Sequence, residues 1–242
     1  MIKIENVTKT FKENTVLNNV SINFEKGKIH GLIGRNGSGK TVLMKCICGF
    51  IPVTSGSITV RNKVICKNNV PENIGLIIET PGFLPNYSGY RNLKFLADIS
   101  GKANKNAIIR SIESVGLDPH SKKHVGKYSL GMRQRLGLAQ AIMEDPDLLI
   151  LDEPMNGLDK DGVKDMRDYL LKLKEQGKTI IVLDDNDVID MIKIWKSDSE
   201  NNSSIVFQEK LNNLYTLLVV SLVIVLIVVY AMPKFADKEQ KI

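Results

Sequence analysis

The segment from Tyr128 to Glu153, YSLGMRQRLGLAQAIMEDPDLLILDE, constrains the fold more than any other part of the chain. It opens with a serine and a glycine, continues in a helical pattern, and turns at Asp145-Pro146 into a short apolar strand. The strand ends in two acids, Asp152 and Glu153. A helix followed by an apolar strand with acids at its carboxyl end is typical of a parallel sheet in an α/β protein.

A second motif lies upstream, where residues 34–41 read GRNGSGKT and match the phosphate-binding loop G-x-x-x-x-G-K-[ST] at every position. The glycines let backbone N–H groups turn toward phosphate oxygens, and the loop leads into a helix whose amino end favours an anion. We expect Lys40 to reach the β- and γ-phosphates and the Thr41 hydroxyl to ligate Mg²⁺. The expected nucleotide-binding residues here are Gly34, Arg35, Asn36, Gly37, Ser38, Gly39, Lys40, Thr41 and Val42.

The two strand-end acids supply the carboxylates that a phosphate loop needs. The carboxyl end of a parallel strand lies beside such a loop, so Asp152 is expected to make a further magnesium contact. Glu153 points in another direction and can orient or deprotonate the attacking water. The alternative is that both are exposed turn acids ahead of Pro154.

These motifs, in this order, resemble the nucleotide-binding subunits of ABC transporters over residues 1–190. Ser129-Leu130-Gly131-Met132 resembles the family's signature LSGGQ, although Leu130 and Met132 depart from it, and the bacitracin-resistance and lantibiotic self-protection branch has a similar Ser-x-Gly-Met form. Locally, Ser129 can cap the helix while Gly131 exposes backbone N–H groups to phosphate. The resemblance implies that this helix end contacts ATP bound to a second ABC ATPase subunit, identical or not.

The resemblance assigns further positions. Phe11 lies where the family places an aromatic residue that stacks on adenine, although it also fits an apolar residue at a strand end. Glu79 stands where most members have a glutamine that contacts magnesium and signals to the permease, and it also fits an ordinary strand-end acid. Residues 156–159, NGLD, resemble the loop that contacts the partner subunit.

One catalytic position departs from the family's pattern. After the strand at 179–183 the family places Ser-His, whose histidine reaches the γ-phosphate, whereas this chain reads Asp184-Asp185. An ionised carboxylate cannot donate a hydrogen bond, and at about 4 Å from a phosphate charge the repulsion is about 4 kcal/mol at an effective dielectric near 20. We expect ready ATP binding and slow hydrolysis, unless Asp185 only caps the helix that begins near Val188.

The pattern as a whole predicts an α/β fold of the P-loop NTPase type, an ABC ATPase domain over residues 1–197. Alternating residues up to about Ile29 predict an antiparallel β subdomain, and the helical pattern at about 88–145 predicts a subdomain inserted into a mostly parallel core sheet. The other expected strands are 28–34, 57–67, 74–78, 147–151 and 179–183, and the other helices are 40–50 and 163–176.

The carboxyl-terminal region predicts a membrane anchor. Residues 198–213 read as a linker, 233–242 as a short tail, and the uncharged run 214–232 as a transmembrane helix in contact with lipid. Its nineteen residues would span about 28 Å, close to the hydrocarbon core of a bilayer. A buried core helix is the alternative, but a run that is apolar on all faces after a polar linker disfavours it.

Charge and cysteine content exclude several functional classes. The 33 basic and 27 acidic residues give a net charge of +6, and the basic residues between Lys102 and Lys127 have no interleaved aromatics, so we expect no nucleic-acid binding. Three cysteines do not make a disulfide framework, and Cys46 and Cys48 point to different faces of a helix, so we expect buried thiols.

Together these features predict an ATP- and Mg²⁺-dependent ATPase subunit of a bacterial ABC transporter that exports peptide or antibiotic-like substrates. Its expected catalytic residues are Glu153, Lys40 and Asp185, and its partners are permease subunits and a second ATPase subunit. The expected location is the cytoplasmic membrane, with a single-pass anchor and the ATPase domain facing the cytoplasm. The alternatives are a degenerate regulatory subunit paired with a competent ATPase, and a membrane-tethered scaffold of the ABC type.

Overall fold

The computed structural model describes residues 1–34, 36–79 and 82–184. The chain divides into two compact units, Met1–Ile205 and Val206–Ile242, and all described residues belong to the first. Arg35, Asp185, the linker at 198–213, the expected span at 214–232 and the tail at 233–242 therefore lie outside the described residues. In the part that is described, no helix is long and apolar enough to cross a bilayer.

A four-stranded parallel sheet forms the centre of the described unit, with the order β3-β8-β7-β6. Its strands are β3 (Ile29–Ile33), β6 (Ile74–Ile77), β7 (Leu148–Asp152) and β8 (Thr179–Asp184). The first four residues of β7 are buried, which explains the unbroken apolar run, because helices cover both faces of a parallel sheet. The predicted parallel core is confirmed, and all four carboxyl ends meet at one edge.

A second, antiparallel sheet of order β2-β1-β4-β5 flanks this core, and its strands lie on both sides of β3 in the sequence. It consists of β1 (Ile2–Phe11), β2 (Asn14–Phe24), β4 (Ser55–Val60) and β5 (Lys63–Val64). Ile22 and Phe24 are buried and Ser21 and Asn23 are exposed, as the alternation predicted. The pairing of β1 with β2 shifts register between Ile4 and Val7, so both residues face the core although they are three apart.

The prediction of one continuous strand over 57–67 is wrong. The chain instead forms a hairpin, because Arg61 and Asn62 both adopt left-handed backbone angles (φ 49° and 64°) and turn β4 into β5. Two successive residues with positive φ make a tight turn whose twist matches the strands around it. Only Asn62 belongs to a residue type that favours this geometry, so the turn signal was weak.

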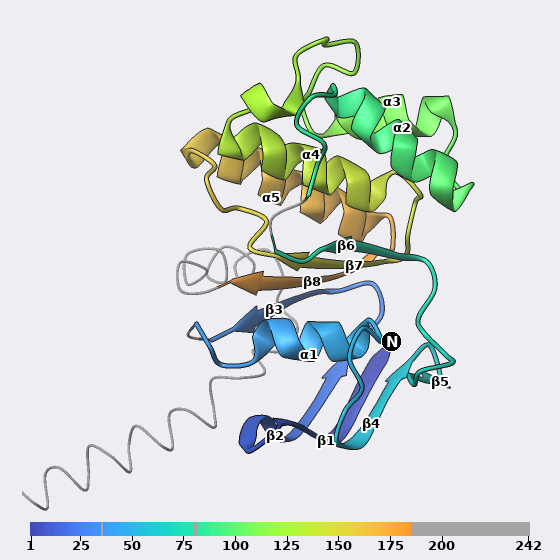
Figure 1. Ribbon diagram of the computed structural model, residues 1–242, viewed down its shortest axis with the longest axis vertical. Helices are drawn as coiled ribbons and strands as arrows, with labels where there is room; N and C mark the ends of the chain where they lie inside the picture. Colours follow the sequence, from blue (N-terminus) through green and yellow to red (C-terminus); the bar gives the residue numbers. More distant parts are fainter. Residues whose placement is uncertain (35, 80–81, 185–242) are drawn as a thin grey trace, which may run out of the picture. The chain divides into compact units, whose positions relative to one another are not determined.

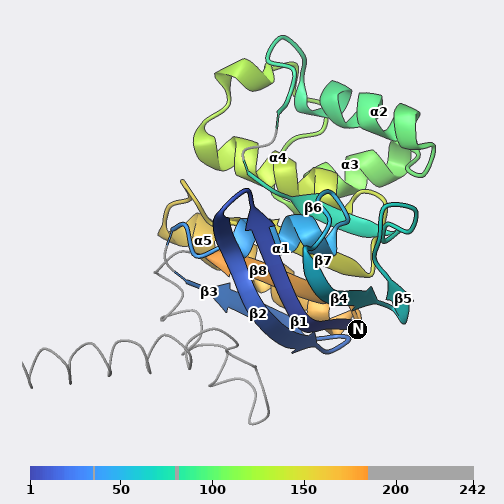
Figure 2. The same ribbon diagram turned by 60° about the horizontal axis from the view of Figure 1, so that its bottom comes forward.

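Two helices cover the faces of the parallel sheet. Helix α1 (Lys40–Ile47) lies between the two sheets, and α5 (Lys160–Glu175) covers the opposite face of the parallel sheet (Figures 1 and 2). The prediction of α1 to residue 50 was too long, because Gly49 takes a positive φ of 74°. Helix α5 begins three residues earlier than predicted, because the Asp159 carboxylate accepts a hydrogen bond from the Gly162 N–H at 2.8 Å.

The predicted helical block contains α2 (Gly89–Ser100), α3 (Lys105–Ser114), a short 3₁₀ turn (Val125–Lys127) and α4 (Leu130–Ile142). Leu93 and Ala97 on α2 are buried as the spacing predicts, whereas Leu96 is 36% exposed. The buried side chains of α4 join those of β7, β8 and α5 in one apolar cluster. This cluster fixes the start of α4 relative to the sheet edge.

Candidate nucleotide-binding site

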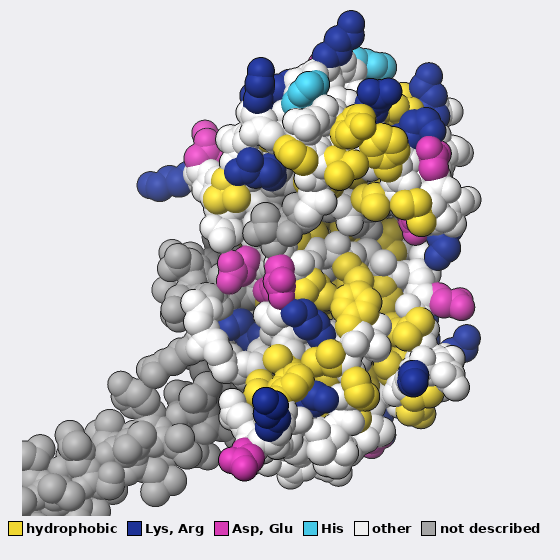
Figure 3. All heavy atoms as spheres, viewed as in Figure 1, with side chains coloured by type: hydrophobic (Ala, Val, Ile, Leu, Met, Phe, Trp, Pro, Cys, Tyr) yellow, Lys and Arg dark blue, Asp and Glu magenta, His cyan; other side chains and the backbone are white. Residues whose placement is uncertain are grey.

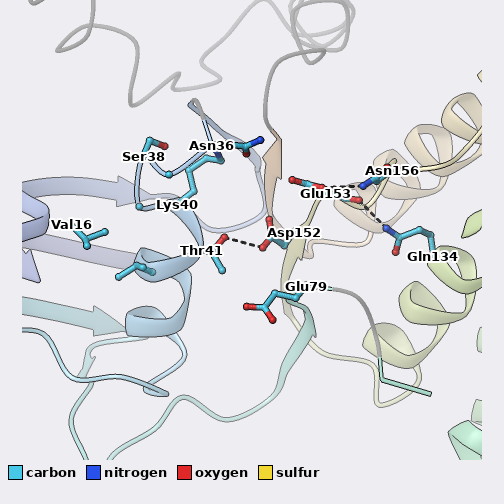
Figure 4. A pocket seen from close by; sticks show the side chains of 13 residues that line it. Val16, Asn36, Ser38, Lys40, Thr41, Glu79, Gln134, Asp152, Glu153 and Asn156 are labelled. Carbon is cyan, nitrogen blue, oxygen red and sulfur yellow. Dashed lines mark hydrogen bonds between the residues drawn. The ribbon is translucent and has the colours of Figure 1, made fainter. Parts of the chain in front are cut away.

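A cavity of about 480 Å³ opens at the edge where the parallel strands end (Figure 4). It is formed by the phosphate-loop segment, the ends of β6 and β7, and one residue each from β2 and α4. Its lining residues are Val16, Asn36, Gly37, Ser38, Gly39, Lys40, Thr41, Val42, Glu79, Gln134, Asp152, Glu153 and Asn156. Residues far apart in the sequence therefore converge on one hollow.

The loop between β3 and α1 requires two of its glycines for different reasons. Gly39 has a φ of 90°, and a Cβ there would lie 2.9 Å from Leu17 Cδ2 and 3.0 Å from the Val16 carbonyl oxygen. Gly37 has a φ of 80° with open space around it, so only its backbone angle favours glycine. The motif therefore keeps the loop close to β2, and residues 36–39 of the loop line the cavity.

Helix α1 differs from the other α-helices of the described region at its amino end. Those helices are each capped by a side chain, from Ser88, Asn104, Ser129 and Asp159, whereas Gly39 provides no such cap for α1. The first N–H groups of α1 thus have no side-chain acceptor of this kind within the helix start. Such an end suits a phosphate group, because the helix dipole adds to the N–H donors.

Thr41 and Asp152 come together at the base of the cavity. The Thr41 hydroxyl donates a hydrogen bond to Asp152 Oδ2 at 3.2 Å (Figure 4). The Lys40 ammonium donates to the carbonyl oxygen of Gly34, which folds its side chain across the loop. The Thr41 hydroxyl and the Asp152 carboxylate, with Glu79 on the same cavity wall, are oxygen ligands of the kind that fits a hard divalent cation such as Mg²⁺.

Glu153 is held in place from several sides. Its backbone has a φ of 47°, a left-handed angle that is uncommon for glutamate, and its N–H donates to the Leu183 carbonyl oxygen at 3.0 Å. Its carbonyl oxygen accepts from Gln134 Nε2 at 3.2 Å, and its carboxylate accepts from Asn156 Nδ2 at 3.1 Å (Figure 4). The carboxylate therefore has a defined direction next to the phosphate loop.

Glu79 has a different neighbour. Its Oε1 atom lies 2.7 Å from the Lys45 ammonium, which projects from α1. Its backbone φ is 61°, a second left-handed angle at the cavity wall. The acid expected from sequence therefore lines the same cavity as Thr41 and Asp152 and is paired with a lysine.

Four described residues that the sequence assigned to nucleotide binding do not line the cavity, namely Phe11, Gly34, Ser129 and Gly131. Gly34 instead accepts a hydrogen bond from the Lys40 ammonium through its carbonyl oxygen. Ser129 is exposed and caps α4 by accepting from the Met132 N–H at 3.2 Å, and Gly131 follows it in the first turn. Gly131 is half-buried, and the contact of both residues with a second subunit stays a prediction. Phe11 is 44% exposed at the end of β1, with the Lys9 ammonium 4.7 Å from its ring centre.

Gln134 and Asn156 are functional candidates that sequence reasoning missed. Gln134 is buried on α4, lines the cavity, and has an Oε1 atom with no hydrogen-bond partner in the described part of the chain. Asn156 lies in the segment that was expected only to contact a partner subunit. Gln134 belongs to the sequence Arg-Gln-Arg-Leu at 133–136, which follows the signature-like residues and resembles the family's pattern. That pattern was the available signal, but the contact of Gln134 with Glu153 depends on the tertiary fold.

The thiols take no part in this site. Burial raises the pKa of Cys46 to about 11 and that of Cys48 to about 12, so both stay protonated and unreactive near neutral pH. The expectation of buried thiols is wrong for Cys66, which is exposed. Cys66 lies beyond β5 in a segment that was predicted to be strand, where its backbone pairs with that of Asn69 in a short bridge.

The parallel sheet, the phosphate loop that enters α1 and the carboxylates at the end of β7 define an α/β protein that binds nucleoside phosphates. A family model described as ABC transporter matches residues 17–156, more than half of the 242-residue chain. The chain belongs to the ABC transporter family, among its ATP-binding subunits.

Curated relatives agree with this assignment. The uncharacterized ABC transporter ATP-binding protein YybJ of Bacillus subtilis is 49% identical over 183 residues, which cover 75% of this chain and 84% of YybJ. The bacitracin transport ATP-binding protein BcrA of Enterococcus faecalis is 45% identical over 185 residues, covering 75% of this chain and 60% of BcrA. The lantibiotic transport ATP-binding protein SrtF of Streptococcus pyogenes is 41% identical over 182 residues, covering 75% of this chain and 79% of SrtF.

Solved structures share the fold. The ATP-binding cassette MJ0796, solved as a dimer in a post-hydrolysis state bound to ADP and Pi, has a TM-score of 0.70 at 23% identity. The match covers 78% of this chain and 89% of MJ0796. At this identity the likeness establishes the arrangement of strands and helices.

Proposed function

We propose that this chain binds Mg-ATP at the cavity between the phosphate loop and β7, hydrolyses it across a dimer interface, and drives a permease that exports peptide or antibiotic-like substrates. The observation that carries the proposal is the convergence of Thr41 and Asp152, 3.2 Å apart, beside the Lys40 side chain and the carboxylate of Glu153. The relatives named for bacitracin and lantibiotic transport support the substrate class.

Each residue of the cavity has a task in this proposal. The N–H groups of the loop and Lys40 bind the β- and γ-phosphates. Thr41, Asp152 and Glu79 would hold Mg²⁺, which would offset the negative charge of the phosphates. Glu153, directed by Asn156, orients the attacking water and accepts its proton.

The start of α4 supports a dimeric enzyme. Ser129 and Gly131 lie outside the cavity of their own subunit, at an accessible helix end with donor groups suited to phosphate. We propose that they complete the ATP site of a second ATPase subunit. Each subunit then has an incomplete site until two of them meet.

An apolar surface on the helical block supports a membrane partner. Hydrophobic side chains gather over α2 and the segment before it (Figure 3), where Leu84 is 49%, Phe95 39% and Ile99 83% exposed. Large apolar side chains grouped at a surface mark a contact site for another protein. We propose that a permease subunit covers them and holds this chain at the cytoplasmic side of the membrane.

The proposal also includes two features outside the described residues. Asp185 in place of the usual histidine is proposed to slow hydrolysis, and residues 214–232 are proposed to cross the membrane once. Neither is needed for ATP binding at the cavity. Both are tested separately below.

The test of nucleotide binding uses the full chain in detergent and a fluorescent ATP analogue with Mg²⁺. Lys40→Ala should weaken binding roughly tenfold or more, because it removes a charge-assisted contact to phosphate. Lys67→Ala, which removes an exposed lysine that does not line the cavity, is the control and should leave affinity unchanged. If the unaltered protein has no affinity for the analogue, or if both variants bind alike, the proposed function is wrong.

A further inference from the structure

The ion pair between Lys45 and Glu79 connects α1 to the end of β6. Lys45 lies one helical turn after Thr41, so the two side chains share a face of α1. Its ammonium is 2.7 Å from Glu79 Oε1, and the two side chains are 34% and 67% exposed. Lys45 is therefore paired with a carboxylate that lines the nucleotide cavity.

The position of Glu79 makes this pairing relevant to the site. Glu79 lines the same cavity as Thr41 and Asp152, and its side chain is directed toward α1 (Figure 4). A carboxylate near a divalent cation and an ammonium is attracted by both, whereas the two cations repel each other. The ammonium and Mg²⁺ must then compete for Glu79.

We propose that Lys45 is a positioning residue that holds Glu79 before nucleotide arrives and releases it when Mg²⁺ binds. The proposal rests on the proposed function, because it concerns the metal that accompanies ATP at this cavity. When ATP binds without metal, the Lys45 charge offsets the repulsion between the Glu79 carboxylate and the phosphates. It also opposes the binding of Mg-ATP, so Lys45 sets how strongly nucleotide binding depends on the metal.

The expected effect is small because the pair is exposed. Exposed ion pairs contribute little, so breaking this one changes a binding ratio by about 2- to 5-fold. The effect must also shrink at high salt, since added ions screen exposed charges. A glutamine at position 79 carries no charge, so it should reduce the contribution of Lys45 to this ratio.

The experiment measures the dissociation constant of a fluorescent ATP analogue with excess Mg²⁺ and again with EDTA, on the full chain. The ratio of the two constants is compared for the unaltered protein, Lys45→Met, Glu79→Gln and the double variant. Lys94→Met is a matched control, because Lys94 forms an exposed ion pair of 2.6 Å with Asp98 on α2, away from the cavity.

We expect Lys45→Met to raise the metal-free to metal-bound ratio about 2- to 5-fold when residue 79 is glutamate and to have a distinctly smaller effect when it is glutamine. Lys45→Arg keeps the positive charge, so its ratio should equal that of the unaltered protein. An equal change in both backgrounds would mean that Lys45 acts on the phosphates directly and would overturn the proposal, as would no change with glutamate. Failure of the proposed function has a different signature, namely no nucleotide binding in any of these proteins.

Discussion

At the residue scale, the direction of Glu153 depends on two amides that come from different parts of the chain. Gln134 reaches its carbonyl oxygen from α4, and Asn156 reaches its carboxylate from the loop after β7. The left-handed backbone of Glu153 needs such contacts, because residues in this region cost free energy that the surroundings must offset. Small changes in these neighbours should therefore alter catalysis more than binding.

Gln134→Met should lower the turnover number roughly 5- to 30-fold while Mg-ATP affinity stays within about twofold, because the methionine leaves a buried carbonyl without its donor. Steady-state hydrolysis and analogue binding, measured on the same preparation, separate the two quantities. Gln140→Met makes the same replacement on the same helix, at a position that does not line the cavity. Equal turnover of the two variants would contradict the role given to Gln134.

Asp185→His should raise turnover roughly tenfold or more, because histidine donates a hydrogen bond to the γ-phosphate where the carboxylate repels it. Asp185→Asn removes the charge without supplying the imidazole, so it separates the two contributions. Release of phosphate from ATP under saturating Mg²⁺ gives the measurement. Unchanged turnover with histidine would indicate that Asp185 acts only as a helix cap.

Sequence reasoning located the chemical groups better than their contacts. The phosphate loop and the carboxylates of β7 are continuous motifs, so Thr41, Asp152 and Glu153 could be named before their geometry was known. Lys45 and Gln134 could not, because their roles arise from contacts with Glu79 and Glu153 across long stretches of sequence. Such contacts depend on the order of the strands in the sheet and on the position of each helix, and a local sequence pattern predicts neither.

At the element scale, the packing of α4 against β6 depends on one glycine. A Cβ on Gly75 would lie 2.0 Å from the carbonyl oxygen of Ala141 and 2.5 Å from a methyl group of Leu149. The backbone of α4 thus approaches β6 more closely than any side chain permits. This close approach holds the carboxyl end of α4 (Leu130–Ile142) against β6.

Gly75→Ala should destabilise the protein by about 2–4 kcal/mol, because the helix must move away from the sheet. Gly82→Ala is the control, since a Cβ there meets no atom within 4 Å, and its effect should stay within about 0.5 kcal/mol. Urea unfolding followed by circular dichroism provides both values. Similar urea midpoints for the two variants would contradict this expectation, because they would show that α4 can shift to accommodate the added methyl group without loss of stability.

The elements themselves were largely predictable, and the errors have local causes. Strands with long apolar runs, such as β7 and β8, were placed within a residue of their bounds. The β4–β5 hairpin was missed because its turn, Arg61-Asn62, contains neither glycine nor proline. Helix ends were set by a cap at Asp159 and a left-handed Gly49, which periodicity does not report.

At the scale of the whole molecule, the chain combines an ATP-binding unit with a carboxyl-terminal apolar run. If residues 214–232 cross the bilayer, alkaline carbonate should leave the protein in the membrane pellet even without permease subunits. Carbonate disrupts electrostatic contacts with the membrane surface, whereas a spanning helix is held by its apolar side chains. A variant truncated after residue 205 should appear in the supernatant under the same conditions. Release of the full chain would exclude a spanning helix.

The order of the parallel sheet has a consequence for synthesis. Strand β8 (Thr179–Asp184) is the last described strand along the chain, yet it lies between β3 and β7. While a ribosome is still translating the preceding residues, β3 has no neighbour on that side and β7 has only β6. The nascent polypeptide therefore leaves the place between β3 and β7 unfilled until β8 emerges, and it remains exposed to chaperones and proteases until that moment.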